Sequence, residues 1–225
     1  GNTIKKAQHV KYAYEKGVRL YATDSEADLK NIATYAPGSK VFVRILVEGS
    51  DTAEWPLSRK FGCDPAMATD LLIQARDLGL VPYGVSFHVG SQQKSVAVWN
   101  DALLMVKDIF DQLLNEQNIK LQMINLGGGF PARYLSDVNP IKEYAEAVKQ
   151  YLVDSYGTED MPEIILEPGR SLAASSGVLV SEVVLISRKS HDDTTRWVYT
   201  DVGLFQGLIE TLGEAIKYPV YTPKM

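Results

Sequence analysis

The chain has 225 residues, enough to bury a substantial core as one large domain or as one domain with part of another. Its 23 Lys and Arg and 28 Asp and Glu give a net charge of −5, and no basic run interleaved with aromatic residues appears, so we expect no nucleic acid partner. Cys63 is the only cysteine, which excludes an intrachain disulfide and a CxxC metal motif and favours a reducing compartment. The apolar stretches are too short to span a bilayer and the first residues lack a signal-peptide core, so we expect a cytoplasmic protein without membrane contact.

Residues 3–168 alternate between helical and strand patterns. In chain order, the expected elements are a helix at 3–16, a strand at 18–23, a helix at 24–36, a strand at 41–47, a helix that begins at Pro65, a strand at 82–89, a helix at about 96–116, a strand at 121–127, a helix at about 140–156 and a strand at 163–168. Asp24 or Ser25 can cap the second helix, and Pro65 suits the first turn of the third. Five strands and about five helices in strict βα order predict an α/β fold with a parallel sheet, which we interpret as a TIM-type (β/α)8 barrel.

The pattern changes beyond Gly177. Residues 178–190 and 194–203 are long β-rich stretches separated by a short polar turn, which predicts an antiparallel pair from a second, all-β domain. We therefore assign residues 1–176 to a partial βα barrel and residues 177–225 to the start of a C-terminal β domain.

Both predicted domains look incomplete. A closed barrel needs eight strands, whereas five are recognisable, and a β domain of two or three strands is too small to stand alone. Gly1 and Asn2 look like the loop at the end of a preceding strand. We therefore expect this chain to be the middle of a longer polypeptide.

Three short strings each follow an apolar run of strand character: SFHVGSQ at 86–92, INLGGGFP at 124–131 and ILEPGR at 165–170. Because strand ends of a βα barrel meet at one mouth, the three strings should converge there. The mouth would then hold a flat ring, hydroxyl and backbone N–H donors, and one charge of each sign. Pyridoxal phosphate is the simplest ligand that needs all of these.

The ILEPGR string suits the ring of such a cofactor. Glu167, held at the end of a buried strand by Pro168 and Gly169, can pair with a protonated pyridine nitrogen and keep the ring an electron sink. The alternative is a structural ion pair between Glu167 and Arg170. The presence of the other two strings favours the functional interpretation.

The other two strings suit the phosphate and the face of the ring. Gly127, Gly128 and Gly129 permit close backbone approach to a phosphate, although a tight strand-to-helix turn would also need them. His88 can stack on the ring and Ser91 can donate to the phosphate, whereas a lone histidine on an apolar strand is more often a core residue. Three histidines without paired spacing argue against a metal site, and the lack of a GxSxG context argues against a serine hydrolase.

Two basic residues lie outside these strings. Arg44 is in the middle of the strand expected at 41–47, where an unpaired charge would be costly, so we expect it to meet a carboxylate or the cofactor inside the barrel. Lys60 lies in a polar loop expected at 48–63, and its default interpretation is an exposed, solvated side chain.

Six segments together resemble the fold type III, pyridoxal phosphate-dependent basic amino acid decarboxylases, over essentially the whole chain. They are GNTIKK at 1–6, EWPLSRKFGC at 54–63, SFHVGSQQ at 86–93, GGGFPARYL at 127–135, EPGR at 167–170 and IETLGEAIKYP at 209–219. The resemblance implies a homodimeric carboxy-lyase of polyamine biosynthesis that converts L-ornithine to putrescine, with lysine as a second substrate.

The same resemblance implies residue roles. His88 stacks on the cofactor ring and Glu167 pairs with the pyridine nitrogen, which makes these two the catalytic residues. Ser91, Gly129 and the segment 169–170 hold the phosphate. Lys60, outside this site, would lie at the subunit interface.

The resemblance also implies that some parts of the site lie outside the chain. The Schiff-base lysine of the family would lie upstream of Gly1, and its partner cysteine and a phosphate-binding tyrosine would lie downstream of Met225. Lys5 and Lys6 sit at a helix start and Cys63 belongs to another motif. We therefore expect the segment alone to be inactive.

The substrate assignment rests on the segment 209–219, where family members often carry an acidic residue for the distal amine. At the aligned position this chain has Gly213 with Glu214 beside it, and Glu210 is also near, so we assign Glu214 and Gly213 to substrate contact. Alternatives are a lysine, arginine or diaminopimelate decarboxylase, an alanine racemase-like barrel, and a non-catalytic relative that binds a regulatory partner.

Overall fold

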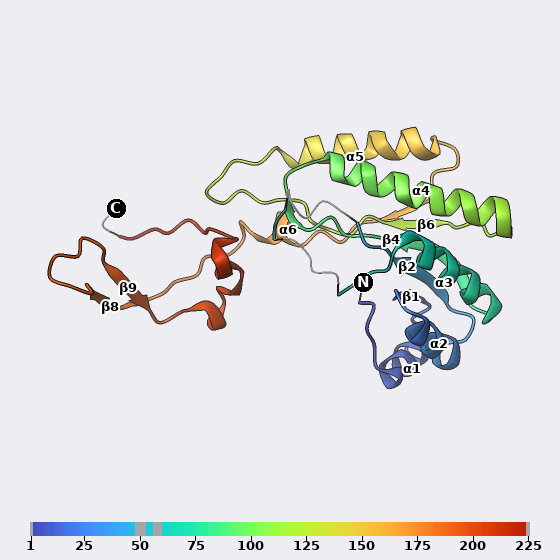
Figure 1. Cartoon of the computed structure of the whole chain (residues 1–225), viewed down its shortest axis with the longest axis horizontal. Coiled ribbons are helices and arrows are strands. Elements are labelled where there is room, and N and C mark those ends of the chain that lie inside the picture. The colour runs from blue at the N-terminus through green and yellow to red at the C-terminus, as the bar shows by residue number, and fades with distance from the viewer. Residues whose placement is uncertain (1, 48–52, 56–59, 224–225) are drawn as a thin grey trace.

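The computed structural model describes residues 2–47, 53–55 and 60–223. Within these ranges it has a curved parallel sheet wrapped by helices and a thin C-terminal arm that extends away from it (Figure 1). Gly1 and most of the loop expected between 48 and 59 lie outside the described residues. Among the helices that the structure describes, none combines the length and the apolarity that crossing a bilayer requires.

The central sheet confirms the predicted parallel architecture. Its strands are β1 (Leu20–Thr23), β2 (Lys40–Arg44), β4 (Val81–Ser86), β6 (Met123–Asn125) and β7 (Glu163–Ile165), and they lie side by side in chain order. Every neighbouring pair is parallel. Strands that follow one another in space as they do in sequence form the wall of a βα barrel, in which each crossover helix returns to the next strand.

Helices α1 (Ala7–Glu15), α2 (Glu26–Tyr35), α3 (Pro65–Asp77), α4 (Ala97–Gln117) and α5 (Ile141–Tyr156) surround this sheet in the same order (Figure 1). Pro65 opens α3 as expected, and the Asp64 side chain caps it by accepting from the Met67 N–H at 2.8 Å. Ser25 occupies the N-cap position of α2, but its side chain makes no capping hydrogen bond. Asp24 instead accepts from the Gly62 N–H at 2.7 Å and fixes the loop before α3.

The alternation of side chains along the strands separates two apolar layers. Val43, Val85 and Ile124 face the helices and belong to the main core, whereas Phe42 and Met123 belong to a smaller cluster on the other face of the sheet. The larger layer holds the aromatic group that anchors the loop after β6: Trp99 stacks on Phe130 at 4.9 Å and meets Tyr144 edge-on at 6.0 Å. Phe130 directly follows the glycine run, so this packing sets the position of the glycines.

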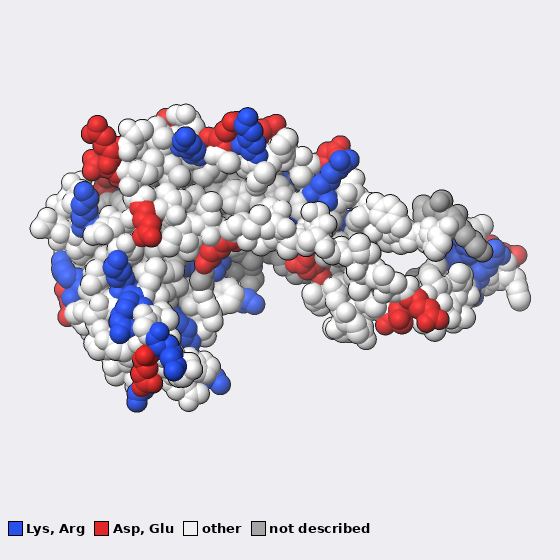
Figure 2. Space-filling model, turned by 180° about the vertical axis from the view of Figure 1, so that it is seen from behind, with Lys and Arg blue, Asp and Glu red and all other residues white. Residues whose placement is uncertain are grey.

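The C-terminal arm contains the predicted antiparallel pair, formed by β8 (Val183–Ser187) and β9 (Trp197–Thr200). Both strands are shorter than the expected stretches, since the residues on either side of them are not part of the β8–β9 pairing. Two 3-10 turns follow, η2 (Leu204–Gln206) and η3 (Ile209–Glu214). In the view of Figure 2, uncharged residues form most of the surface of this arm, while both signs of charge are spread over the body.

Three short elements did not follow from the sequence pattern. Strands β3 (Ala53–Trp55) and β5 (Ser91–Gln93) form a separate antiparallel pair, and α6 (Arg170–Ala173) is a single turn after β7. Two of these begin at residues of the predicted site, Ser91 and Arg170. Each is too short to show a period of its own in the sequence.

Candidate functional site

The three strings converge, as predicted, because the sheet ladder continues past the strand ends. Phe87 N donates to Asn125 O at 3.1 Å, and Leu126 N donates to Ile165 O at 2.9 Å. Glu167 N then donates to Gly127 O at 2.9 Å. The loops after β4, β6 and β7 are therefore tied together at the carboxyl edge of the sheet, where ligands of parallel βα folds bind.

The glycine run lies against the backbone of both neighbouring loops. A Cβ on Gly127 would meet Phe87 O at 2.3 Å, and a Cβ on Gly128 would meet Glu167 O at 2.5 Å. Gly129, at φ +97°, would direct a Cβ to 2.4 Å from Gly90 O. The glycine run therefore forms a tight turn and also lets neighbouring backbone come close. The structure is compatible with both a structural turn and a phosphate-binding loop. In the part of the chain that the structure describes, no hydrogen bond is recorded from the N–H of Gly128 or Gly129.

His88 lies beside this run with one ring nitrogen already engaged. Its Nδ1 accepts from the Gly90 N–H at 3.0 Å, so a proton on the neutral ring is at Nε2. Burial, and next the positive charge of Arg44, lower the pKa of His88 to about 4. The ring is therefore neutral at pH 7.

Glu167 and Arg44 share this mouth. The pKa of Glu167 is lowered overall: burial opposes this change, and a hydrogen bond from Asn125 and the charge of Arg44 are among the interactions that favour it. Burial lowers the pKa of Arg44, while Glu167 and then Asp24 raise it. Arg44 ends β2, and its guanidinium lies 5.6 Å from the centre of the Phe61 ring. The expected carboxylate neighbour of Arg44 is thus Glu167, acting through its charge.

Arg170 forms the most connected polar contact of the site. Its Nη1 and Nη2 donate to Glu210 at 2.9 and 2.7 Å, while Nε and Nη2 donate to Ser91 Oγ at 3.1 and 3.0 Å. Nη1 also donates to Tyr134 Oη at 3.1 Å. The carboxylate that pairs with Arg170 is therefore Glu210, not Glu167 as the alternative interpretation of the EPGR string required.

Of the remaining predicted residues, two lie next to Arg170 and two lie at an exposed kink. Pro168 and Gly169 connect Glu167 to Arg170, and a Cβ on Gly169 would meet nothing within 4 Å. Glu214 lies outside the cluster: its side chain is 82% exposed and pairs with Lys217 at 3.0 Å. Gly213 forms the kink beside it, at φ +64°. The structure therefore brings Glu210, rather than Glu214 or Gly213, to the carboxyl edge of the sheet.

Two aromatic members of the cluster lie in segments that resemble the family, but the sequence analysis gave neither of them a role. Tyr134 and Tyr218 meet edge-on at 5.2 Å, and Tyr218 Oη donates to Glu210 Oε2 at 3.2 Å. One follows the glycine run and the other follows η3, 84 residues later, and only the folded chain shows that they meet.

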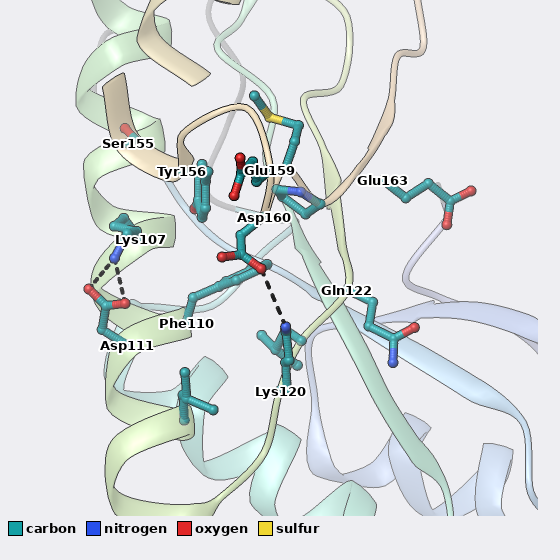
Figure 3. Close-up of a pocket in the computed structure, with 14 residues that line it drawn as sticks. Lys107, Phe110, Asp111, Lys120, Gln122, Ser155, Tyr156, Glu159, Asp160 and Glu163 are labelled. Carbon is teal, nitrogen blue, oxygen red and sulfur yellow. Dashed lines mark hydrogen bonds and ion pairs between the residues drawn. The ribbon is translucent and has the colours of Figure 1, made fainter. Parts of the chain in front are cut away.

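Two cavities lie away from this cluster. One of about 550 Å³ opens at the amino ends of β6 and β7, where Lys107 pairs with Asp111 and Lys120 pairs with Asp160 (Figure 3). The other, about 560 Å³, is lined almost wholly by apolar side chains along α5 and the edge strand β7. The first cavity also combines rings, a hydroxyl and charges of both signs, but it lies at the opposite end of the strands from the converging loops.

Comparisons with known proteins agree with this geometry. Residues 1–174 match the family model for the pyridoxal-dependent decarboxylase, pyridoxal binding domain. The chain is 29% identical to the lysine/ornithine decarboxylase of Selenomonas ruminantium over 98% of its own length and 54% of that protein, and 30% identical to the ornithine decarboxylase of Saccharomyces cerevisiae over 91% and 42%. It thus spans about half the length of the curated relatives it matches.

Solved structures show the same likeness. A lysine/ornithine decarboxylase from Vibrio vulnificus complexed with putrescine aligns with a TM-score of 0.81 and 25% identity, covering 97% of this chain and 56% of that one. The structure of SrLDC in complex with PLP and cadaverine aligns with a TM-score of 0.79 and 29% identity, covering 94% and 51%. The family match over residues 1–174, together with the converging strand ends, shows that the chain belongs to the pyridoxal-dependent decarboxylases and carries their pyridoxal binding domain.

Proposed function

We propose that the whole protein decarboxylates L-ornithine to putrescine with pyridoxal phosphate held at the carboxyl edge of the sheet. The observation that carries this proposal is the position of Gly128. A Cβ there would lie 2.5 Å from the backbone carbonyl oxygen of Glu167 and 3.7 Å from His88 Nε2, so the backbone that carries the acid and the ring of His88 meet at one point of the carboxyl edge.

The residues fit each part of the cofactor. The neutral ring of His88 would stack on the pyridine, and the carboxylate of Glu167 would hold a proton on the pyridine nitrogen. Ser91 and the N–H groups of Gly128 and Gly129, which donate no recorded hydrogen bond within the described residues, would hold the phosphate. When bound, the cofactor supplies the electron sink for the electron pair that remains when the α-carboxylate leaves as carbon dioxide.

Arg44 would act through its charge. It lies close enough to Glu167 and His88 to shift the pKa of each downward. It would therefore keep Glu167 ionised until the cofactor nitrogen arrives, and keep His88 neutral.

Ornithine is favoured as the substrate because several similar relatives are named ornithine decarboxylase, and the lysine/ornithine decarboxylase carries ornithine in its name as well. We keep Glu214, at the kink made by Gly213, as the proposed contact for the distal ammonium of the substrate. Its ion pair with the exposed Lys217 would have to open for that contact to form. We also propose a cytoplasmic homodimer with Lys60, an exposed residue, at the subunit interface.

The test is Glu167→Ala in the whole protein, assayed by carbon dioxide release from ornithine and from lysine. Loss of the group that keeps the ring protonated should lower turnover by about a hundredfold or more, as for other preorganised electrostatic contacts. Glu159→Ala, an exposed acidic residue before β7, is the matched control and should keep full activity.

Three results would overturn parts of this proposal. Wild-type turnover in the Glu167→Ala protein would remove Glu167 from the site. Faster turnover of lysine than of ornithine by the unmodified protein would replace the substrate. No carbon dioxide from ornithine, lysine, arginine or diaminopimelate, in a protein that binds pyridoxal phosphate, would indicate a non-catalytic relative.

A further inference from the structure

The cavity of about 550 Å³ at the amino ends of β6 and β7 lies near the carboxyl ends of two long helices, α4 and α5 (Figure 3). In a βα unit the helix runs antiparallel to the strands, so both helix ends point to this edge of the sheet. The carboxyl end of a helix carries a partial negative charge, and neither helix has a basic residue in its last turn. The electrostatics of this edge therefore favour a cation.

The backbone at the end of α5 also leaves hydrogen-bond acceptors unused. Gly157 N donates to Val153 O in the last turn of the helix. Among the described residues, no hydrogen bond is recorded to the carbonyl oxygens of Ser155 and Tyr156, two residues that line the cavity. Carbonyl groups at a helix end need donors from outside the helix. An ammonium group, with three N–H donors and no acceptor, matches them in charge and in hydrogen bonding.

The wall of the cavity already accommodates an ammonium group on an alkyl stem. Lys107 Nζ pairs with Asp111 and lies 5.9 Å from the centre of the Tyr156 ring (Figure 3). That ring meets Phe110 edge-on at 5.6 Å. Carboxylates and aromatic rings together are the groups that bind organic cations. The lining therefore suits a protonated aliphatic amine.

A second acceptor for such a ligand is Asp160. Its carboxylate is 85% exposed and pairs with Lys120 at the long distance of 3.8 Å, so a second ammonium group can replace Lys120 at little cost. Leu114, Leu121 and Met161 line the same cavity and suit a methylene stem. Within the described part of the chain, no group of three or more His, Cys, Asp or Glu side chains could hold a metal ion, which favours an organic cation here.

We propose that this cavity binds an aliphatic diamine, with one ammonium group at the carboxyl end of α5 and the other at Asp160. The methylene stem would lie along the apolar part of the lining. The site is at the opposite end of the strands from the proposed cofactor site, and the inference does not rest on the proposed function. Putrescine belongs to this class of ligand and serves as the probe.

The experiment is hydrogen–deuterium exchange of the whole protein, titrated with putrescine at constant ionic strength. Exchange at residues 155–161 reports on this cavity, whereas exchange at 86–92 and 165–170 reports on the carboxyl edge, so diamine bound at the two places is told apart. We expect slower exchange at 155–161, and its dependence on concentration gives the dissociation constant. Butylamine, which has one ammonium group on the same stem, should bind about fivefold more weakly, and magnesium chloride should have no effect.

Two variants test the two ends of the ligand. Asp160→Asn should weaken putrescine binding about fivefold and leave butylamine, held at the end of α5, unchanged. Asp77→Asn, an exposed carboxylate that pairs with Arg76, is its matched control. Ser155→Lys supplies an ammonium group at the end of α5 and should block both amines without destabilising the helix. Ser190→Lys, in the exposed turn of the arm, makes the same change of charge away from the cavity.

Three results would overturn the proposal. One is unchanged exchange at residues 155–161 when putrescine is added. Another is an equal effect of magnesium chloride, which would indicate unspecific attraction of cations. The third is protection that survives Ser155→Lys, because an amine bound at the end of α5 cannot remain when a lysine occupies that position.

Discussion

Residues 2–176 and residues 177–223 carry similar apolar strands, yet only the first part buries them. Val41 and Val43 of β2 are fully buried, whereas Val184 of β8 is 65% exposed and Val198 of β9 is 54% exposed. In the described part of the arm, Ile216 is the one apolar residue that is buried. Strand propensity therefore forms the β8–β9 pair without supplying a core, since two strands have no second layer to cover them.

A polar and aromatic cluster joins the two parts. Arg170 and Tyr134 of the first part meet Glu210 and Tyr218 of the arm. A body with a large buried core and an arm whose apolar side chains are mostly exposed should respond differently to the same kind of substitution.

A tryptophan pair gives the largest expected difference. Trp99 is fully buried against Phe130, so Trp99→Ala should destabilise the 225-residue chain by about 3–5 kcal/mol through the lost contacts and the cavity. Trp197 of β9 is 51% exposed, and Trp197→Ala should cost less than about 1 kcal/mol. Urea unfolding of both variants measures the difference.

The whole protein sharpens this comparison. If the rest of the polypeptide covers β9, Trp197→Ala should cost more there than in the 225-residue chain, while Trp99→Ala should cost the same in both. Equal costs for Trp197 in the two contexts would show that the arm stays uncovered.

Two glycines give an intermediate difference. Gly128→Ala places a Cβ 2.5 Å from a backbone oxygen, so the loops after β6 and β7 must separate, at a cost of about 1–3 kcal/mol and with weaker cofactor binding. Gly177 has open space around it, and Gly177→Ala should change neither quantity. Thermal unfolding with and without pyridoxal phosphate tests both, and a tolerated Gly128→Ala would contradict the close approach described here.

The smallest expected effect is a pH dependence of the body. The pKa of His88 is about 4 in the folded chain and near 6.5 when unfolded, so the unfolded state takes up the proton first as the pH falls. The contribution of His88 to stability is complete above about pH 6.5 and should have dropped by about 1 kcal/mol at pH 5.5. Urea unfolding at pH 7.5 and 5.5 should show this loss of unfolding free energy. In the His88→Gln variant, the difference between the two pH values should be smaller by about 1 kcal/mol.

The order of strands and helices could be predicted because periodicity and local end signals, such as Pro65 at the start of α3, depend on neighbouring residues. The position of the mouth followed from the topology, since strand ends of a parallel sheet share one edge. The partner of Arg170 did not follow. Glu210 lies 40 residues away in a segment with little regular structure, and only the folded chain shows that it, rather than Glu167, meets the guanidinium.

The chain-order arrangement of β1, β2, β4, β6 and β7 has a consequence for synthesis on the ribosome. Each new strand pairs with the strand made just before it, so no unit has to wait for a distant one before it can dock. Contacts of short sequence separation form quickly, and segments made first can fold first. A growing chain of this topology can extend its sheet one βα unit at a time, always leaving one open edge for the unit that comes next.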